Sequence, residues 1–127
     1  DIDATQIPDL VPVLATVAAV SEGTTTIRGA ARLRLKESDR IESVCSMLSS
    51  LGADVKATDD GLMIYGKSSL NGGTVDTFND HRIAMSAAVA SVACENEVTV
   101  SGAECVEKSY PDFWNDIETY LSLNIKK

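Results

Sequence analysis

Histidine, cysteine pairs and aromatic side chains are scarce in this sequence of 127 residues. It holds one histidine, and aromatic residues make up 5% of the chain. The three cysteines, Cys45, Cys94 and Cys105, form no C-x-x-C pair, whereas a zinc site needs closely spaced cysteine and histidine ligands. We therefore expect no metal site, and free, mostly buried thiols in a reducing compartment.

Long apolar runs and excess positive charge are also missing. No apolar stretch approaches the roughly 20 residues of a membrane-spanning helix, and the stretch from Leu10 to Val20 is interrupted by Pro12 and Thr16. The chain starts without methionine and without a basic signal-peptide region, which suggests a fragment. A formal net charge of −8 argues against nucleic-acid binding. We expect a protein that binds neither membranes nor nucleic acids.

The apolar content, 44% hydrophobic residues, is enough for a core, and the length suits a single domain over residues 1–127. Apolar positions at three- and four-residue spacing predict helices, and short β-branched runs between turn residues predict strands. The expected helices span about 9–20, 38–51, 79–94 and 111–121, and the expected strands span 24–28, 54–57, 62–65, 74–78 and 98–101.

The expected elements repeat. Helix, strand, charged loop and helix recur at a spacing of roughly 70 residues, without a linker between the two sets. Alternation of helices and strands is typical of α/β layers. We predict two related units of an α/β fold of the α+β type, with helices packed against mixed sheets.

Cations gather in one segment of this acidic chain. Arg32, Arg34 and Lys36 alternate, so that on an extended segment their side chains would point the same way. Lys36 and Arg40 flank the start of a predicted helix, and a helix N-terminus favours anions. This pattern indicates a site for a carboxylate or phosphate. The alternative is a solvated charge run with internal ion pairs, which stabilise little.

Three other predicted helices also begin at polar clusters. Asp9 suits a helix N-cap, a role compatible with facing a ligand. Arg82, in Asn79-Asp-His-Arg82, can hold an anion through two hydrogen bonds, with His81 as a secondary candidate. Lys108 precedes the last helix and is otherwise an ordinary surface lysine. Cations and carboxylates at helix starts suit an enzyme that handles an anionic substrate by acid–base chemistry.

Several of these motifs resemble, in order and spacing, those of the 5-enolpyruvylshikimate-3-phosphate (EPSP) synthase family. The resemblance extends from Asp3 to about Leu121. The motifs are Ile7-Pro-Asp9, Lys36-Glu-Ser-Asp-Arg40, Asn79-Asp-His-Arg-Ile-Ala-Met85, Gly102-Ala-Glu-Cys105 and Lys108-Ser-Tyr-Pro-Asp-Phe113.

The resemblance implies a fold and an activity. The family fold has two domains, each of three βαβαββ units, and this chain is similar to about two of the three units of the C-terminal domain. The family is a group of transferases of the shikimate pathway, which leads to aromatic amino acids, and for this chain we expect a cytoplasmic location. They move the enolpyruvyl group of phosphoenolpyruvate to the 5-hydroxyl of shikimate 3-phosphate and release phosphate, without any cofactor.

The resemblance also implies residue roles. Asp9 matches the carboxylate at the shikimate hydroxyls, Glu37 a residue that exchanges a proton with the phosphoenolpyruvate methylene, and Lys36 a lysine near the reacting oxygen. Arg40 and Arg82 match the pair that holds the phosphoenolpyruvate carboxylate, and Lys108 matches a phosphate ligand. Asp80 and His81 match neighbours that shape the pocket. Arg32 stands where many members have asparagine, so it is only a candidate for binding.

The resemblance also implies a gap, because the family's N-terminal half supplies further substrate ligands that this chain lacks. We therefore expect no meaningful turnover from the chain alone. One alternative is the sister family that acts on UDP-N-acetylglucosamine, which the motifs at Lys36 and Lys108 disfavour. Another is a non-catalytic module that self-associates through exposed apolar surface or complements the missing half.

Overall fold

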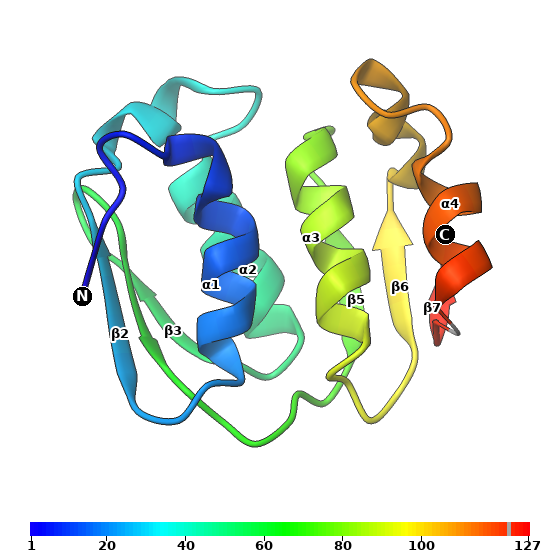
Figure 1. Cartoon of the computed structure of the whole chain (residues 1–127), viewed down its shortest axis with the longest axis horizontal. Helices are drawn as coiled ribbons and strands as arrows, with labels where there is room; N and C mark the ends of the chain where they lie inside the picture. The colour runs from blue at the N-terminus through cyan, green and yellow to red at the C-terminus, as the bar shows by residue number, and fades with distance from the viewer. Residues whose placement is uncertain (122) are drawn as a thin grey trace.

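The computed structural model describes residues 1–121 and 123–127, and two sheets form its frame (Figure 1). The first sheet has the strand order β1–β2–β4–β3, in which β1 and β2 are parallel and β4 is antiparallel to both neighbours. The second has the order β5–β6–β7, with parallel strands throughout. The bounds are β1 Ile2–Asp3, β2 Thr24–Arg28, β3 Asp54–Ala57, β4 Leu62–Tyr65, β5 Gly73–Asp76, β6 Val98–Ser101 and β7 Ile125–Lys126.

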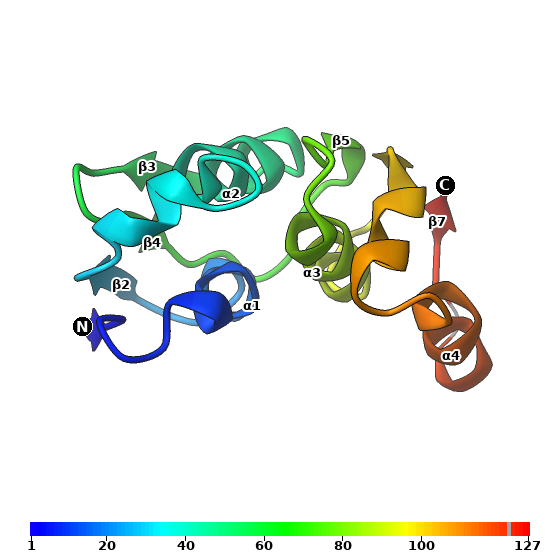
Figure 2. The same ribbon diagram turned by 90° about the horizontal axis from the view of Figure 1, so that it is seen from above.

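Helices cover one face of each sheet. Seen from above, α1 and α2 lie on the face of the first sheet that is turned toward the second, and α3 and α4 lie on one side of the second sheet (Figure 2). Helix α3 also packs against α1 and α2, which joins the two halves. The helices are α1 Val11–Ala19, α2 Arg40–Ser50, α3 His81–Ser91 and α4 Phe113–Tyr120, with 3-10 helices η1 Pro8–Leu10, η2 Ala31–Leu35 and η3 Ala103–Lys108.

The chain contains a complete βαβαββ unit followed by most of a second. The first is β1-α1-β2-α2-β3-β4, and β5-α3-β6-α4-β7 follows the same order through its fifth element. In both, a 3-10 helix follows the second strand and precedes the second helix. The expectation of two related units is thus confirmed, and helices packed against sheets agree with the expected fold class.

The local signals explain these elements. The turn Asp59-Asp-Gly61 joins β3 to β4 as an antiparallel hairpin. Helix α2 buries its predicted apolar face, including Ile41, Val44 and Leu48, in a core shared by both sheets. Helix α3 is built largely from small residues, and these lie buried against the other helices. Among the described residues, no helix is long and apolar enough to cross a bilayer.

Two local predictions are wrong. The segment with Arg32, Arg34 and Lys36 is not extended: Ala31–Leu35 forms η2, and neighbours two apart on a helix do not share a face. No strand was expected after Ser101, but Ile125–Lys126 forms β7, in which Lys126 pairs with Thr99. A strand of two residues, of which only Ile125 is β-branched, gives no local signal, so that pairing with β6 decides its conformation.

The cysteines are free, as expected, but only one is buried. Cys105 lies in the core, whereas Cys45 and Cys94 are half-buried. Burial raises the pKa of Cys94, and burial is also the largest cause of the raised pKa of Cys105. Both therefore remain thiols rather than reactive thiolates near neutral pH.

Candidate functional site

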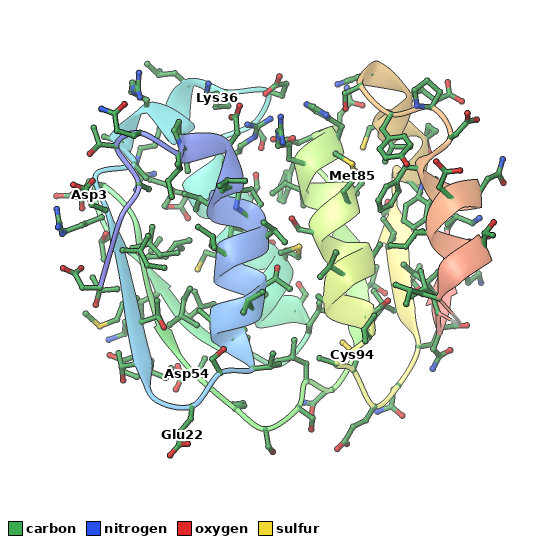
Figure 3. The ribbon with its side chains drawn as sticks, in the orientation of Figure 1. Asp3, Glu22, Lys36, Asp54, Met85 and Cys94 are labelled. Carbon is green, nitrogen blue, oxygen red and sulfur yellow. The ribbon has the colours of Figure 1, made fainter. Side chains whose placement is uncertain are left out.

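The predicted site residues gather at one end of the molecule. The 3-10 segments and the starts of α1, α2 and α3 all lie at the upper end in Figure 1, and Figure 3 places Lys36 there. Each helix thus directs its N-terminal N–H groups toward the same region, which favours negative charge.

A buried ion pair between the two units is the centre of the site. Arg40, at the start of α2, is 2% exposed, and Asp80, before α3, is fully buried. Arg40 Nε donates to Asp80 Oδ2 over 2.8 Å, and Arg40 Nη2 donates to Asp80 Oδ1 over 3.2 Å. These two hydrogen bonds fix the planes of the guanidinium and the carboxylate relative to each other, and they link α2 to α3.

The remaining acceptor capacity of Asp80 is also used. Ser38 Oγ donates to Asp80 Oδ2 over 2.8 Å, and the Arg82 backbone N–H donates to Oδ1 over 3.0 Å. Burial acts most strongly on Asp80 and opposes its ionisation, but the hydrogen bonds from Arg40 and Ser38 outweigh it and lower its pKa. Asp80 is therefore an ionised counter-charge that also caps α3.

Two further carboxylates surround the outer side of the Arg40 guanidinium. Arg40 Nη2 donates to Glu37 Oε2 over 2.6 Å, and Arg40 Nη1 donates to Asp9 Oδ1 over 3.1 Å. Unlike Asp80, these side chains are 44% and 50% exposed. A ligand carboxylate can therefore replace Glu37 or Asp9 on Arg40 without disturbing the buried pair.

Asp9 is not the helix cap that its position suggests. Helix α1 has Leu10 as its N-cap and no side-chain cap hydrogen bond, and Asp9 itself lies within η1. Its carboxylate instead faces cations, with Lys36 Nζ at 3.9 Å from Oδ1 and Arg82 Nη2 at 3.7 Å from Oδ2. Of the two roles that the sequence allowed for Asp9, capping a helix and facing a ligand, its surroundings fit only the second.

Glu37 is held in its ionised form. A hydrogen bond from its own backbone N–H lowers its pKa most; partial burial opposes this, and Arg40 lowers the pKa further. Glu37 is thus suited to accept a proton. Donating one requires a change in its surroundings, such as ligand binding or the departure of Arg40.

The second unit contributes His81 and Lys108 to the same region. His81 Nε2 lies 3.7 Å from Glu37 Oε1, and His81 Nδ1 forms a hydrogen bond with Ser109 Oγ. Lys108 Nζ donates to the backbone carbonyl of Asn79. This carbonyl lies in a tight turn, because Phe78 and Asn79 have φ values of 52° and 55°, which non-glycine residues rarely adopt. The turn aims Asp80, His81 and Arg82 at the site.

Two of the cations that cluster in the sequence, Arg32 and Arg34, lie outside the network that Arg40 forms with Asp80, Glu37 and Asp9. Arg32 Nη2 donates to the Thr5 carbonyl over 2.9 Å, on the loop before η1. Arg34 points to the β3–β4 hairpin, where it donates to the Thr58 and Asp59 carbonyls and pairs with Asp39. Because the segment is not extended, the three cations are not aligned. Of the three, only Lys36 reaches a carboxylate that also contacts Arg40, namely Asp9.

A pocket of about 200 Å³ adjoins the network. Asp9 and Arg82 are its charged lining residues, and mainly apolar side chains of η1, α1, α3 and α4 form the rest. Met85, labelled on α3 in Figure 3, lies on its wall. The other lining residues are Leu10, Pro12, Val13, Ser86, Val89 and Phe113.

Metal ligation is disfavoured at this site. Among the described residues, Glu37, Asp80 and His81 bring potential ligand atoms within 4.8 Å of one another. However, both oxygens of Asp80 already accept hydrogen bonds, and the Arg40 guanidinium occupies the position of the counter-cation. A divalent ion would have to displace this buried cation.

Sequence reasoning missed the serines of the network. The sequence placed Ser38 only within the motif from Lys36 to Arg40, without a role of its own. In the structure Asp39 caps α2, with Oδ1 accepting from the Glu42 N–H over 3.3 Å. Ser38 bonds Asp80 instead and accepts from Ser43 Oγ over 2.8 Å. In the sequence, only the position of Ser109 next to Lys108 pointed to the site. The residues around a serine do not show which distant group its hydroxyl will contact.

Comparison with known proteins agrees with this geometry. The sequence model of the family described as EPSP synthase (3-phosphoshikimate 1-carboxyvinyltransferase) matches residues 1–117. The 3-phosphoshikimate 1-carboxyvinyltransferase of Clostridium acetobutylicum is 57% identical over 117 residues, which are 92% of this chain and 27% of the relative. That of Clostridium novyi is 55% identical over the same shares.

A solved structure gives the same result. The EPSP synthase from Acinetobacter baumannii superposes with a TM-score of 0.80 at 38% identity, covering 85% of this chain and 26% of that protein. The chain spans about a quarter of the length of the relatives it matches. On the match over residues 1–117, the chain belongs to the EPSP synthase family.

Proposed function

We propose that this chain forms one side of the active site of a 3-phosphoshikimate 1-carboxyvinyltransferase, with phosphoenolpyruvate and shikimate 3-phosphate as substrates. In this proposal residues 1–127 are one folding unit, which works in the cytoplasm together with the N-terminal half of the enzyme. The observation that carries it is the network in which Asp9, Glu37 and Asp80 surround Arg40.

The proposed binding roles follow from charge and exposure. Arg40 and Arg82 hold the phosphoenolpyruvate carboxylate, since a guanidinium suits a planar anion. The Arg82 side chain is 38% exposed, so it is accessible to a ligand. Lys108 contacts the phosphate as a point charge, Asp80 and His81 shape the pocket, and Arg32 contacts the shikimate moiety if its bond to Thr5 is released.

The proposed chemistry needs a base and an acid. Asp9, close to Lys36 and Arg82, takes the proton of the 5-hydroxyl as its oxygen attacks C2 of phosphoenolpyruvate. Lys36 stabilises negative charge on the reacting oxygen. Glu37 exchanges a proton with the methylene carbon, first giving it and later removing it when phosphate leaves the tetrahedral intermediate. The first step requires Glu37 to be protonated in the closed complex, against the lowered pKa of the free chain.

Amide NMR titration with each substrate tests this proposal. With phosphoenolpyruvate we expect shift changes clustered near Asp9, Lys36 to Arg40, Asp80 to Arg82 and Lys108. Arg82→Gln should abolish most of them. The matched control, Arg28→Gln, removes an exposed arginine that pairs with Asp1 and Asp3, and it should leave them unchanged. A folded chain without such changes would show that this side of the site does not bind by itself.

An exposed apolar stripe supports a second candidate, self-association with another copy of the chain. Val17 on α1 and Val92 at the end of α3 are 53% and 63% exposed. Leu10 and Val89, at 47% and 39%, extend the stripe along the pocket. Helices α1 and α3 pack against each other, and exposed apolar side chains on such a pair favour association. Sedimentation velocity distinguishes a monomer from a dimer, and a monomer at high concentration would refute this candidate.

A further inference from the structure

The single histidine of the chain is held between the two units. His81 opens α3, and its side chain is 10% exposed. Nδ1 is hydrogen-bonded to the Ser109 hydroxyl, and Nε2 faces Glu37 Oε1 at 3.7 Å. Ser109 follows η3 in the second unit, whereas Glu37 lies before α2 in the first.

These contacts determine how the neutral ring is protonated. A neutral imidazole carries one N–H donor and one acceptor nitrogen. An ionised carboxylate only accepts hydrogen bonds, and Glu37 is held ionised. The nitrogen that faces Glu37 is therefore the one that carries the proton. Nδ1 must then accept, and the Ser109 hydroxyl, which can donate or accept, supplies the donor.

We propose that Ser109 is a positioning residue: its hydroxyl donates to Nδ1 of His81 and holds the ring as the Nε2–H tautomer, with that N–H directed at Glu37. The inference extends the proposed function, because Glu37 is the carboxylate proposed to exchange the substrate proton. A donor fixed beside Glu37 keeps its carboxylate oriented between the two proton transfers.

Ser109 is itself held in position. Its backbone N–H donates to the Val106 carbonyl over 3.1 Å. Its neighbour Lys108 donates to the Asn79 carbonyl, so that adjacent residues hold the two sides of the turn before α3. Trp114 Nε1 fixes the start of η3 through the Ala103 carbonyl at 2.9 Å. The Ser109 hydroxyl therefore lies on a segment, η3 and the residues after it, that several hydrogen bonds hold in place.

The imidazole nitrogens of the 15N-labelled chain report this tautomer directly. Because the chain has one histidine, a long-range correlation spectrum of the ring protons contains one pattern. Recorded with the ring neutral, it should show a pyrrole-type Nε2 and a pyridine-type Nδ1. In Ser109→Ala the two nitrogen shifts should move toward each other. Ser109→Thr keeps the hydroxyl and should restore the wild-type pattern. The control is Ser68→Ala, which removes an exposed hydroxyl between β4 and β5.

Two outcomes would overturn the inference. A pyrrole-type Nδ1 in the wild type would show that Ser109 accepts instead of donating, and this result needs no variant. An unchanged pattern in a folded Ser109→Ala chain would show that Glu37 alone sets the tautomer. Neither measurement requires a substrate, so it remains separate from the titration that tests the proposed function.

Discussion

At the scale of single residues, we expect the stability of the fold to depend most strongly on the Arg40–Asp80 pair. Both side chains are buried, whereas the two other carboxylates that contact Arg40, those of Glu37 and Asp9, are about half exposed. Asp80→Asn leaves the guanidinium with Glu37 and Asp9 as its ionic partners. We therefore expect the free energy of unfolding to fall, but by less than the roughly 3–5 kcal/mol of a fully unpaired buried charge. Urea unfolding followed by circular dichroism measures the change.

Two variants control that experiment. Asp54→Asn alters an exposed aspartate of β3, which Figure 3 shows away from the site, and it should change stability by no more than about 0.5 kcal/mol. Adding Arg40→Met to Asp80→Asn removes the buried positive charge that has lost its buried partner and should recover part of the loss. A loss that the double variant deepens would contradict the charge explanation.

The same carboxylates predict how stability depends on pH. The pKa values of Asp80 and Glu37 are lowered in the folded chain, so the unfolded chain binds more protons in acid. Their stabilising contribution is complete above the ordinary carboxyl pKa of about 4 and is lost as pH falls through the folded-state values. Asp80→Asn lacks one of these groups, so its stability should decline less steeply between about pH 5 and pH 2. Parallel curves for both proteins would refute this.

At the scale of elements, the hairpin of the first unit depends on close approach of two backbones. A Cβ added at Gly61 would lie 1.8 Å from the Ile27 carbonyl oxygen, and pairing of Ile27 with Leu62 prevents the strands from separating. We expect Gly61→Ala to destabilise the chain by more than about 2 kcal/mol. Gly23→Ala, where the added Cβ meets open space but φ is +93°, should cost only about 1–2 kcal/mol. Equal losses would show that the clash is relieved by a small shift.

Elements also show how far local patterns reach. The β3–β4 hairpin and β6 have the predicted bounds, because turn residues and β-branched runs act within a few positions. Strands β1 and β7, with two residues each, give no such signal and form only because β2 and β6 offer an edge. The turn at Phe78 and Asn79 was likewise not predicted, since its positive φ values depend on its partners in η3.

At the scale of the whole molecule, the exposed stripe on α1 and α3 should govern association. Val17→Lys combined with Val92→Lys places charge on both helices, and any concentration-dependent increase in sedimentation coefficient should disappear. The control Leu35→Lys alters an apolar side chain that is 86% exposed on η2, outside the stripe, and should have no effect. A control that also abolishes association would place the contact elsewhere.

The sequence by itself determined the elements and the identity of most site residues. Periodicity, turn residues and polar helix starts are local, so they predicted four helices, the hairpin and the junctions at Asp9, Arg40, Arg82 and Lys108. The matching motifs gave the family without any contact being known.

Only the tertiary structure decided how those junctions meet. It turned Asp9 from a cap into a counter-ion, directed Arg34 and Arg32 away from the carboxylates around Arg40, and paired Arg40 with Asp80 across 40 residues of chain. A charged side chain takes its partner from whatever the packing of the two units brings near. Burial then sets how strongly that partner is held and which proton each carboxylate can bind.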